Sequence, residues 1–87
     1  MNNFALRNKT YREIISVMRD KDYFLSYGEI CGLCRNEFEM SASNVMRRVR
    51  ELAERKILDR ELIGKNALFR INPAFNEGVI KLLLGEK

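Results

Sequence analysis

Apolar residues near the N-terminus recur at the spacing of an amphipathic helix. Tyr11, Ile14, Ile15 and Met18 stand at i, i+3, i+4 and i+7, so they share one face of a helix. TYRE, at residues 10–13, has the capping-box form, in which a Thr hydroxyl and a Glu three residues on bond to free backbone N–H groups of the first turn. The pattern predicts a first helix that starts at Thr10 and buries this face.

A second capping-box sequence follows a short aromatic run. YFL, at residues 23–25, stands between turn-forming residues and predicts a very short strand. SYGE, at residues 26–29, then predicts the start of a short helix that ends near Arg35. The apolar residues of this helix are Ile30, Cys31, Leu33 and Cys34.

A third helix is predicted from Ala42 to about Lys56, with Ser41 as its N-cap. At about 100° per residue, the helix has an apolar arc of roughly 120°. That arc holds Ala42, Val45, Met46, Val49, Leu52 and Ala53, whereas Ser43, Asn44, Arg47, Arg48, Arg50 and Glu51 fall outside it. One face therefore suits a core, and the other offers hydroxyl, amide and guanidinium groups.

The period then changes to that of strands. Residues 57–63 and 67–72 are rich in β-branched and aromatic residues, and GKN between them predicts a hairpin loop. A last helix is predicted from Asn76 to about Leu84, apolar on most sides. Because Leu82, Leu83 and Leu84 cannot all face one core, we expect this helix to support a homodimer. The predicted class is mainly α with a small antiparallel β-hairpin (α+β).

The sequence SNVMRRVRELAERKILDREL, at residues 43–62, resembles the recognition helix and first wing strand of winged helix-turn-helix proteins. SYGEICGLC, at residues 26–34, resembles the helix that precedes them, and GKN resembles a short wing tip. The resemblance covers roughly residues 10–72. It implies a single winged-helix domain over residues 1–87, with residues 73–87 as a C-terminal helix and dimerisation element.

The sequence departs from the family pattern in the turn before the recognition helix and at the end of that helix. Lys56 stands where the family prefers Gly, so we expect a less sharp helix end. RNEFEM, at residues 35–40, predicts a longer turn than usual, and it carries Glu37 and Glu39 near the DNA-facing end of the helix, where carboxylates repel phosphate.

Positive charge is concentrated in one third of the chain. Residues 41–70 hold eight Lys or Arg and four acidic residues, an excess equal to the net charge of +4 of all 87 residues. Such a stripe is typical of a protein that binds a polyanion, although a solvated helix face gives the same pattern.

The docking mode of the family implies which residues meet double-stranded DNA. Ser43, Asn44 and Arg47 would face base edges, and Arg48 and Arg50 would reach phosphates. Lys65 at the wing tip would lie along the backbone or in the minor groove. Arg60 and Arg70 on the wing strands would contact phosphate or pair with Glu61 and Asp59. Surface pairs of Arg47 with Glu51 and of Arg50 with Glu54 are the structural alternative.

Cys31 and Cys34, in a C-x-x-C spacing, admit three interpretations. A redox pair belongs at a helix N-terminus, and these residues come later in their helix. A structural zinc site takes four ligands. One chain has two Cys and no His, so it could supply only half of such a site. We expect both to pack in the core as small hydrophobic residues, with an intersubunit metal or thiol switch as the next alternative.

No enzyme constellation or cofactor motif is present, because the chain lacks His and a glycine-rich phosphate loop. No apolar run predicts a membrane span or a signal peptide, so a cytoplasmic location is expected. The predicted function is that of a sequence-specific DNA-binding transcriptional regulator, with helix 42–56 in the major groove and the 58–72 wing on the flanking backbone. Two alternatives stay open: a winged-helix module for protein–protein assembly, and a plasmid or viral replication or partition protein.

Overall fold

The computed structural model describes residues 9–38, 40–75 and 77–84. For residues 82–84 it describes the backbone alone. The elements in these ranges are α2 (Lys9–Met18), β1 (Leu25–Ser26), α3 (Tyr27–Phe38), α4 (Ala42–Glu54), β2 (Leu58–Ile63), β3 (Asn66–Ile71) and α5 (Glu77–Leu84). This order confirms the predicted class, mainly α with a small antiparallel sheet. Within the described ranges, no helix is long and apolar enough to cross a membrane.

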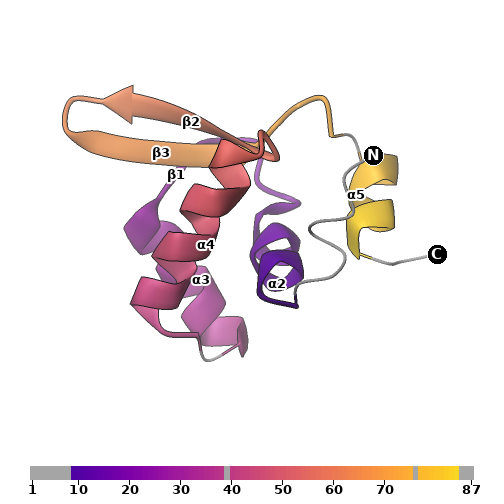
Figure 1. The fold of residues 1–87 in the computed structure, drawn as a ribbon, viewed down its shortest axis with the longest axis horizontal. Helices are drawn as coiled ribbons and strands as arrows, with labels where there is room; N and C mark the ends of the chain where they lie inside the picture. Colours follow the sequence, from indigo (N-terminus) through magenta and orange to yellow (C-terminus); the bar gives the residue numbers. More distant parts are fainter. Residues whose placement is uncertain (1–8, 39, 76, 85–87) are drawn as a thin grey trace.

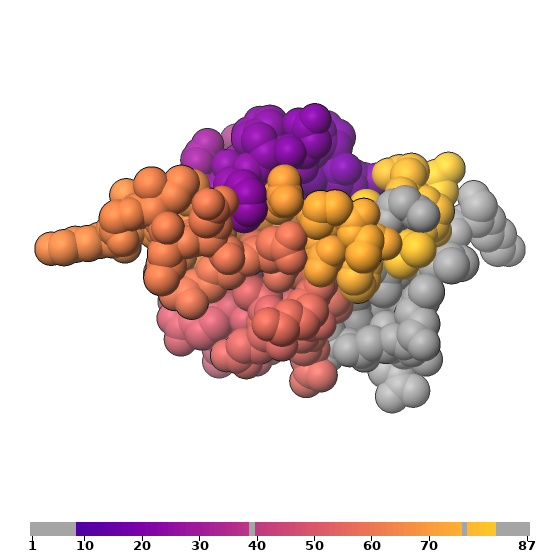
Figure 2. All heavy atoms as spheres, turned by 90° about the horizontal axis from the view of Figure 1, so that it is seen from above, coloured from indigo at the N-terminus to yellow at the C-terminus, as the bar shows by residue number. Residues whose placement is uncertain are grey.

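The sheet is antiparallel and has the strand order β1-β3-β2. β2 and β3 form the predicted hairpin, whereas β1 lies at Leu25–Ser26 instead of residues 23–25, because Leu25 pairs with Phe69 and Ser26 with Leu68. Figures 1 and 2 show that the hairpin projects from the helices at one end of the molecule, while α5 lies at the other.

A single cluster of buried side chains joins the described elements. Its fully buried members come from every helix up to α4 and from the sheet, and include Ile14, Ile30, Val49 and Phe69. The predicted buried face of α2 is confirmed. Thr10 is not the cap of α2, however, because Lys9 before it is already helical.

The predicted core face of α4 is confirmed for Val45, Val49 and Leu52 and is wrong for Met46. Met46 lies at the edge of the apolar arc and remains 38% exposed. Its neighbours on that edge, Ala42 and Ala53, are half-buried. The arc that the core covers is therefore narrower than the arc of apolar residues.

α3 begins at the predicted capping box. The Ser26 hydroxyl accepts from the Glu29 N–H at 3.1 Å, and the Glu29 carboxylate accepts from the Ser26 N–H at 3.0 Å. The helix continues to Phe38, so the predicted end near Arg35 is wrong. Residues 35–37 contain no Gly or Pro, and they form an exposed helical turn. The connection to α4 is therefore three residues long, and the prediction of a longer turn is also wrong.

α4 ends sharply at Glu54, two residues before the predicted end. Lys56 adopts a left-handed backbone conformation with φ of 66°. The Lys56 N–H donates to the Ala53 carbonyl at 3.1 Å, and the Ile57 N–H donates to the Leu52 carbonyl at 3.0 Å. This is a Schellman motif, which usually has Gly at the left-handed position. The expectation of a less sharp end was wrong, because Lys56 takes the conformation that Gly would take.

Asn72 fixes the chain as it leaves the hairpin. Its amide donates to the Lys56 carbonyl at 3.2 Å, and its side-chain oxygen accepts from the Ala74 N–H at 2.9 Å. These bonds tie the end of α4 to the turn at Pro73 and direct the chain toward α5. Ile80 of α5 is buried in the core, while Leu82–Leu84, on which the dimer prediction rests, lie outside the described side chains.

Candidate nucleic-acid interface

The surface of α4 opposite the core carries polar and basic side chains. Ser41 caps the helix as predicted, since its hydroxyl accepts from the Asn44 N–H at 3.3 Å. Ser43, Arg47 and Arg50 are exposed. Asn44 is half-buried, and its side-chain oxygen lies 3.5 Å from Arg47 Nη2, at the limit of a hydrogen bond. The amide and the guanidinium therefore lie together near the start of the helix.

The two faces of the hairpin differ in charge, because side chains alternate along each strand. Leu58, Arg60 and Leu62 share the inner face, where Phe69, the partner of Arg60, is fully buried. The outer face carries Asp59 and Glu61, with Arg70 opposite Asp59. The inner face thus presents one guanidinium among apolar side chains.

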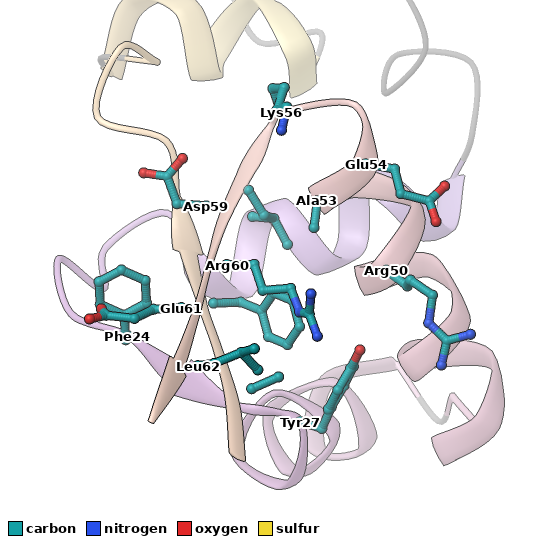
Figure 3. Close-up of a pocket in the computed structure, with 13 residues that line it drawn as sticks. Phe24, Tyr27, Arg50, Ala53, Glu54, Lys56, Asp59, Arg60, Glu61 and Leu62 are labelled. Carbon is teal, nitrogen blue, oxygen red and sulfur yellow. The ribbon is translucent and has the colours of Figure 1, made fainter. Parts of the chain in front are cut away.

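An open groove of about 1160 Å³ lies between α4 and this inner face. We call it the basic groove. Its lining includes Arg50, Ala53 and Glu54 of α4, Arg60 and Leu62 of β2, and Tyr27, Ala67 and Phe69. In Figure 3 Arg60 reaches across the groove toward α4, Arg50 extends from the opposite wall, and the Tyr27 hydroxyl ends between the two side chains. Lys56, Asp59 and Glu61 also line the groove, although the Asp59 and Glu61 carboxylates point away from Arg60 in Figure 3.

Arg50 and Arg60 make no ion pair with any residue in the described part of the chain. The alternative pair of Arg50 with Glu54 is therefore not formed. Lys65 is exposed at the tip of the hairpin, in a two-residue turn whose first residue, Gly64, has φ of 62°. Arg47, Arg50, Arg60 and Lys65 thus offer positive charge to solvent on α4 and on the hairpin.

Comparison with known proteins gives matches in structure alone. No family model matches the chain, and no curated protein matches it in sequence. The chain is similar to HlyU of Vibrio cholerae, a winged-helix regulator, with a TM-score of 0.60 and 19% identity over 92% of this chain and 78% of that one. It is also similar to a possible transcriptional regulator of Methanosarcina mazei, with a TM-score of 0.56 and 20% identity over 95% and 72% of the two chains.

The fold is a winged helix-turn-helix.

In this fold α4 is the recognition helix, α3 is the helix before it, and the β2–β3 hairpin is the wing. Human N-acetylserotonin methyltransferase, solved with SAM, contains a similar structure, with a TM-score of 0.67 and 13% identity over 94% of this chain. This chain spans only 25% of that enzyme. At identities of 13–20% these similarities show the fold alone, because one fold carries many functions.

Arg48, predicted to reach phosphate, is instead engaged inside the winged helix. Its Nη1 donates to the Glu51 carboxylate at 2.7 Å and to the Tyr11 hydroxyl at 3.4 Å, and its guanidinium lies 5.4 Å from the centre of the Tyr11 ring. The Arg48 pKa is raised mainly by the hydrogen bond to Glu51. Glu51 is therefore bonded to Arg48 and Tyr11, and its alternative pair with Arg47 is not formed among the described residues.

Arg70 is likewise held by the outer face of the wing. Its Nε lies 3.9 Å from an Asp59 carboxylate oxygen, and its guanidinium lies 4.7 Å from the centre of the Phe24 ring. The two wing arginines therefore differ. Arg60 faces the basic groove, whereas Arg70 lies at the limit of an ion pair with Asp59, stacks on Phe24, and has no hydrogen-bond partner for its Nε among the described residues.

The cysteines pack as small hydrophobic residues on α3. Cys34 is fully buried, and burial is the main cause that raises its pKa to about 11. Cys31 is half-buried, its Sγ lies 3.9 Å from the Ala42 carbonyl, and burial raises its pKa as well. No group of three or more His, Cys, Asp or Glu suited to a metal ion occurs among the described residues. A raised pKa leaves both thiols mostly protonated near neutral pH.

Two residues of the basic groove were missed by sequence reasoning. Tyr27 was not predicted as a site residue; its ring packs edge-on against that of Phe69, with ring centroids 4.8 Å apart, and its side chain also lines the groove. Leu62 was not considered, although the alternation of β2 places it beside Arg60. Glu37 lines a separate hollow between α2, α3 and α5, and Glu39 lies outside the described residues.

Proposed function

We propose that the protein binds double-stranded DNA in a sequence-specific manner and acts as a transcriptional regulator. The observation that carries this proposal is the placement of Arg50 and Arg60. They come from the recognition helix and the wing, they line one groove, and neither makes an ion pair in the described part of the chain. Arg47 and Lys65 extend the same positive surface toward the start of α4 and the wing tip.

The recognition helix supplies the contacts to bases in this proposal. Ser43, Asn44 and Arg47 enter the major groove, because the N-terminal part of the second helix of a helix-turn-helix meets base edges. Arg47 suits guanine O6 and N7, and Asn44 suits adenine N6 and N7, since each offers a matching bidentate geometry. Lys65 follows the backbone or the minor groove beside the wing.

The proposal also includes a cytoplasmic location, a role that is not enzymatic, and a homodimer formed through the C-terminal helix. Two recognition helices related by a two-fold axis would read two half-sites about one helical turn apart.

A protein–protein assembly module is the second candidate function. It is favoured by the exposed apolar pair on the wing, because Leu62 is 60% exposed and Ile63 is 57% exposed. The occurrence of a similar structure within a methyltransferase chain also supports a role for this fold other than DNA binding.

Fluorescence anisotropy with random-sequence duplex DNA at two salt concentrations tests the proposal. The native protein is compared with Arg47→Glu/Lys65→Glu. The matched control is Lys9→Glu/Lys81→Glu, which changes the net charge equally at exposed residues of α2 and α5. We expect the native protein and the control to bind, with log affinity falling steeply against log salt, and the first variant not to bind.

Equal binding by all three proteins would show that the positive surface is not the DNA surface. If the native protein does not bind even at low salt, the DNA proposal fails, and the assembly module becomes the better explanation. Circular dichroism of each variant confirms that it is folded.

A further inference from the structure

Three hydrogen-bond donors from three elements converge on the basic groove. Arg50 comes from the recognition helix, Arg60 from the inner face of the wing, and the Tyr27 hydroxyl from the start of α3. In the view of Figure 3 the Tyr27 hydroxyl ends between the Arg60 and Arg50 guanidinium groups. The Tyr27 hydroxyl makes no hydrogen bond with any described residue, so it is free to donate to a ligand.

The two guanidinium groups carry like charge and face the same space. Neither is neutralised by an ion pair in the part of the chain that the structure describes. An anion between them would relieve their repulsion and accept from both, and guanidinium groups suit phosphate oxygens in particular. The donors therefore favour a phosphate group as the ligand.

The inner face of the wing gives the groove an apolar part at Leu62, Ala67 and Phe69, although Glu54, Lys56, Asp59 and Glu61 are also among its lining residues. Leu62 and Ala67 form a directly opposed pair on the inner face of the wing, and Leu62 is 60% exposed. A free inorganic anion gains nothing from such an apolar part, whereas a phosphodiester has a sugar attached on each side. The apolar part and the donors together match a sugar–phosphate unit better than an isolated anion.

We propose that the basic groove holds one phosphodiester of a DNA strand, with Arg50, Arg60 and the Tyr27 hydroxyl on the phosphate and Leu62 against the adjoining deoxyribose. This inference rests on the proposed function. It adds a defined backbone site that fixes the wing relative to the recognition helix, and it excludes Arg70, which lies on the opposite face of the same hairpin.

Arg60 and Arg70 provide a matched pair for the test, because both are wing arginines and one of them faces the groove. Affinity for random-sequence duplex DNA is measured by anisotropy over a series of salt concentrations for Arg60→Gln, Arg50→Gln, Arg70→Gln and Tyr27→Phe. We expect the slope of log affinity against log salt to fall by about 0.9 for Arg60→Gln and for Arg50→Gln, as for the loss of one phosphate contact. Arg70→Gln should keep the native slope.

Tyr27→Phe keeps the ring contact with Phe69 and removes only the hydroxyl. We expect it to weaken binding by about fivefold, as for the loss of a neutral hydrogen bond, with the native slope. Urea unfolding of each variant shows that a lost contact, not a lost fold, causes the change.

The inference and the proposed function fail in different ways. If the native protein binds and Arg47→Glu/Lys65→Glu does not, but Arg60→Gln keeps the native slope, DNA binding stands and the groove site is wrong. If Arg70→Gln lowers the slope as much as Arg60→Gln, DNA affinity depends on the total charge of the wing and not on a contact in the groove. That result would also contradict the proposed phosphodiester site. If the native protein shows no salt-dependent binding, both proposals fail.

Discussion

The Tyr11 hydroxyl on α2 donates a hydrogen bond of 2.5 Å to the Glu51 carboxylate on α4, across 40 residues of sequence. Arg48 donates to the same carboxylate oxygen at 2.7 Å. The three side chains lie on the flank of α4 that faces α2. They connect the recognition helix to the first helix of the core, and so they fix its rotation about its own axis.

Tyr11→Phe should lower the free energy of unfolding by about 1.5 kcal/mol, because it removes a hydrogen bond to a charged group and keeps the buried ring. Urea unfolding followed by circular dichroism measures the change. Tyr23→Phe is the control, since Tyr23 is 53% exposed, and it should leave the midpoint unchanged. Equal effects of the two substitutions would show that the bond to Glu51 does not stabilise the fold.

The same cluster predicts a pH dependence of stability. Hydrogen bonds from Tyr11 and then from Arg48 hold the Glu51 pKa below its ordinary value. A carboxyl group whose pKa is lowered by folding stabilises the protein above its unfolded pKa of about 4.3, and this stability is lost as pH falls through the folded pKa. Native stability should therefore fall more steeply below about pH 5 than that of Glu51→Gln.

Urea midpoints at a series of pH values make this comparison. The Asp20 pKa is also lowered, mainly by the hydrogen bond from Lys21, but that contribution is common to both proteins and cancels in the difference. Parallel pH profiles for the native protein and Glu51→Gln would contradict the prediction.

Lys56→Gly should stabilise the protein by about 1 kcal/mol, because glycine adopts a positive φ without the strain that a Cβ causes. The Lys56 backbone bonds to Ala53 and Asn72 remain available to glycine. Lys56→Ala, which keeps a Cβ at the same φ, should gain nothing. Thermal unfolding distinguishes the two, and an equal gain from both would indicate that strain at Lys56 is absent.

The thiols should react slowly in the folded protein. Burial raises the Cys34 pKa to about 11 and also raises that of Cys31, so little of the nucleophilic thiolate is present near pH 8. With an aromatic disulfide reagent, the half-buried Cys31 should react before Cys34, and Cys31→Ala should leave a thiol that reacts only as the protein opens. Rapid reaction of both thiols would instead favour the redox interpretation.

Glu54→Gln should tighten DNA binding by about fivefold at low salt, because a carboxylate beside a bound phosphate costs about 1 kcal/mol. Glu54 is exposed and lines the basic groove, beside Arg50. Glu77→Gln, at the start of α5, removes the same charge far from the wing and should change affinity less. Anisotropy measures both, and weaker binding by Glu54→Gln would place the phosphate elsewhere.

The periodic parts of this fold could be predicted from the sequence. The buried faces of α2 and α4 follow from apolar residues at helical spacing, and the hairpin follows from two β-rich segments around Gly64. The end of α3 could not be predicted in this way, because an exposed polar helical turn and a loop have the same composition. The sharp end of α4 could not be predicted either, because the tertiary structure holds Lys56 in a left-handed conformation that a residue with a Cβ disfavours.

The basic residues of the candidate interface could be predicted from the sequence. Which of them make contacts within the fold, and which face solvent alone, could not. Arg48 is engaged mainly by Glu51, its i, i+3 neighbour, which a local pattern could have indicated, and also by Tyr11, 37 residues away, which no local pattern gives. Arg70 is occupied by Phe24, also distant in sequence. The difference between Arg60 and Arg70 could have been anticipated, because the alternation that places Leu58 in the core also places Arg60 on that face.

The position of β2 at the edge of the sheet affects how readily copies of the chain can associate through their strands. A sheet edge has unpaired backbone groups that can recruit another copy of the chain, and charged residues along such a strand oppose this recruitment. Asp59, Arg60 and Glu61 stand in succession on β2. If a second β2 paired with it antiparallel, the registers that oppose Asp59 to itself, Asp59 to Glu61 or Glu61 to itself would bring carboxylates face to face. These carboxylates therefore oppose fibril-like growth from a hairpin that exposes the apolar side chains of Leu62 and Ile63.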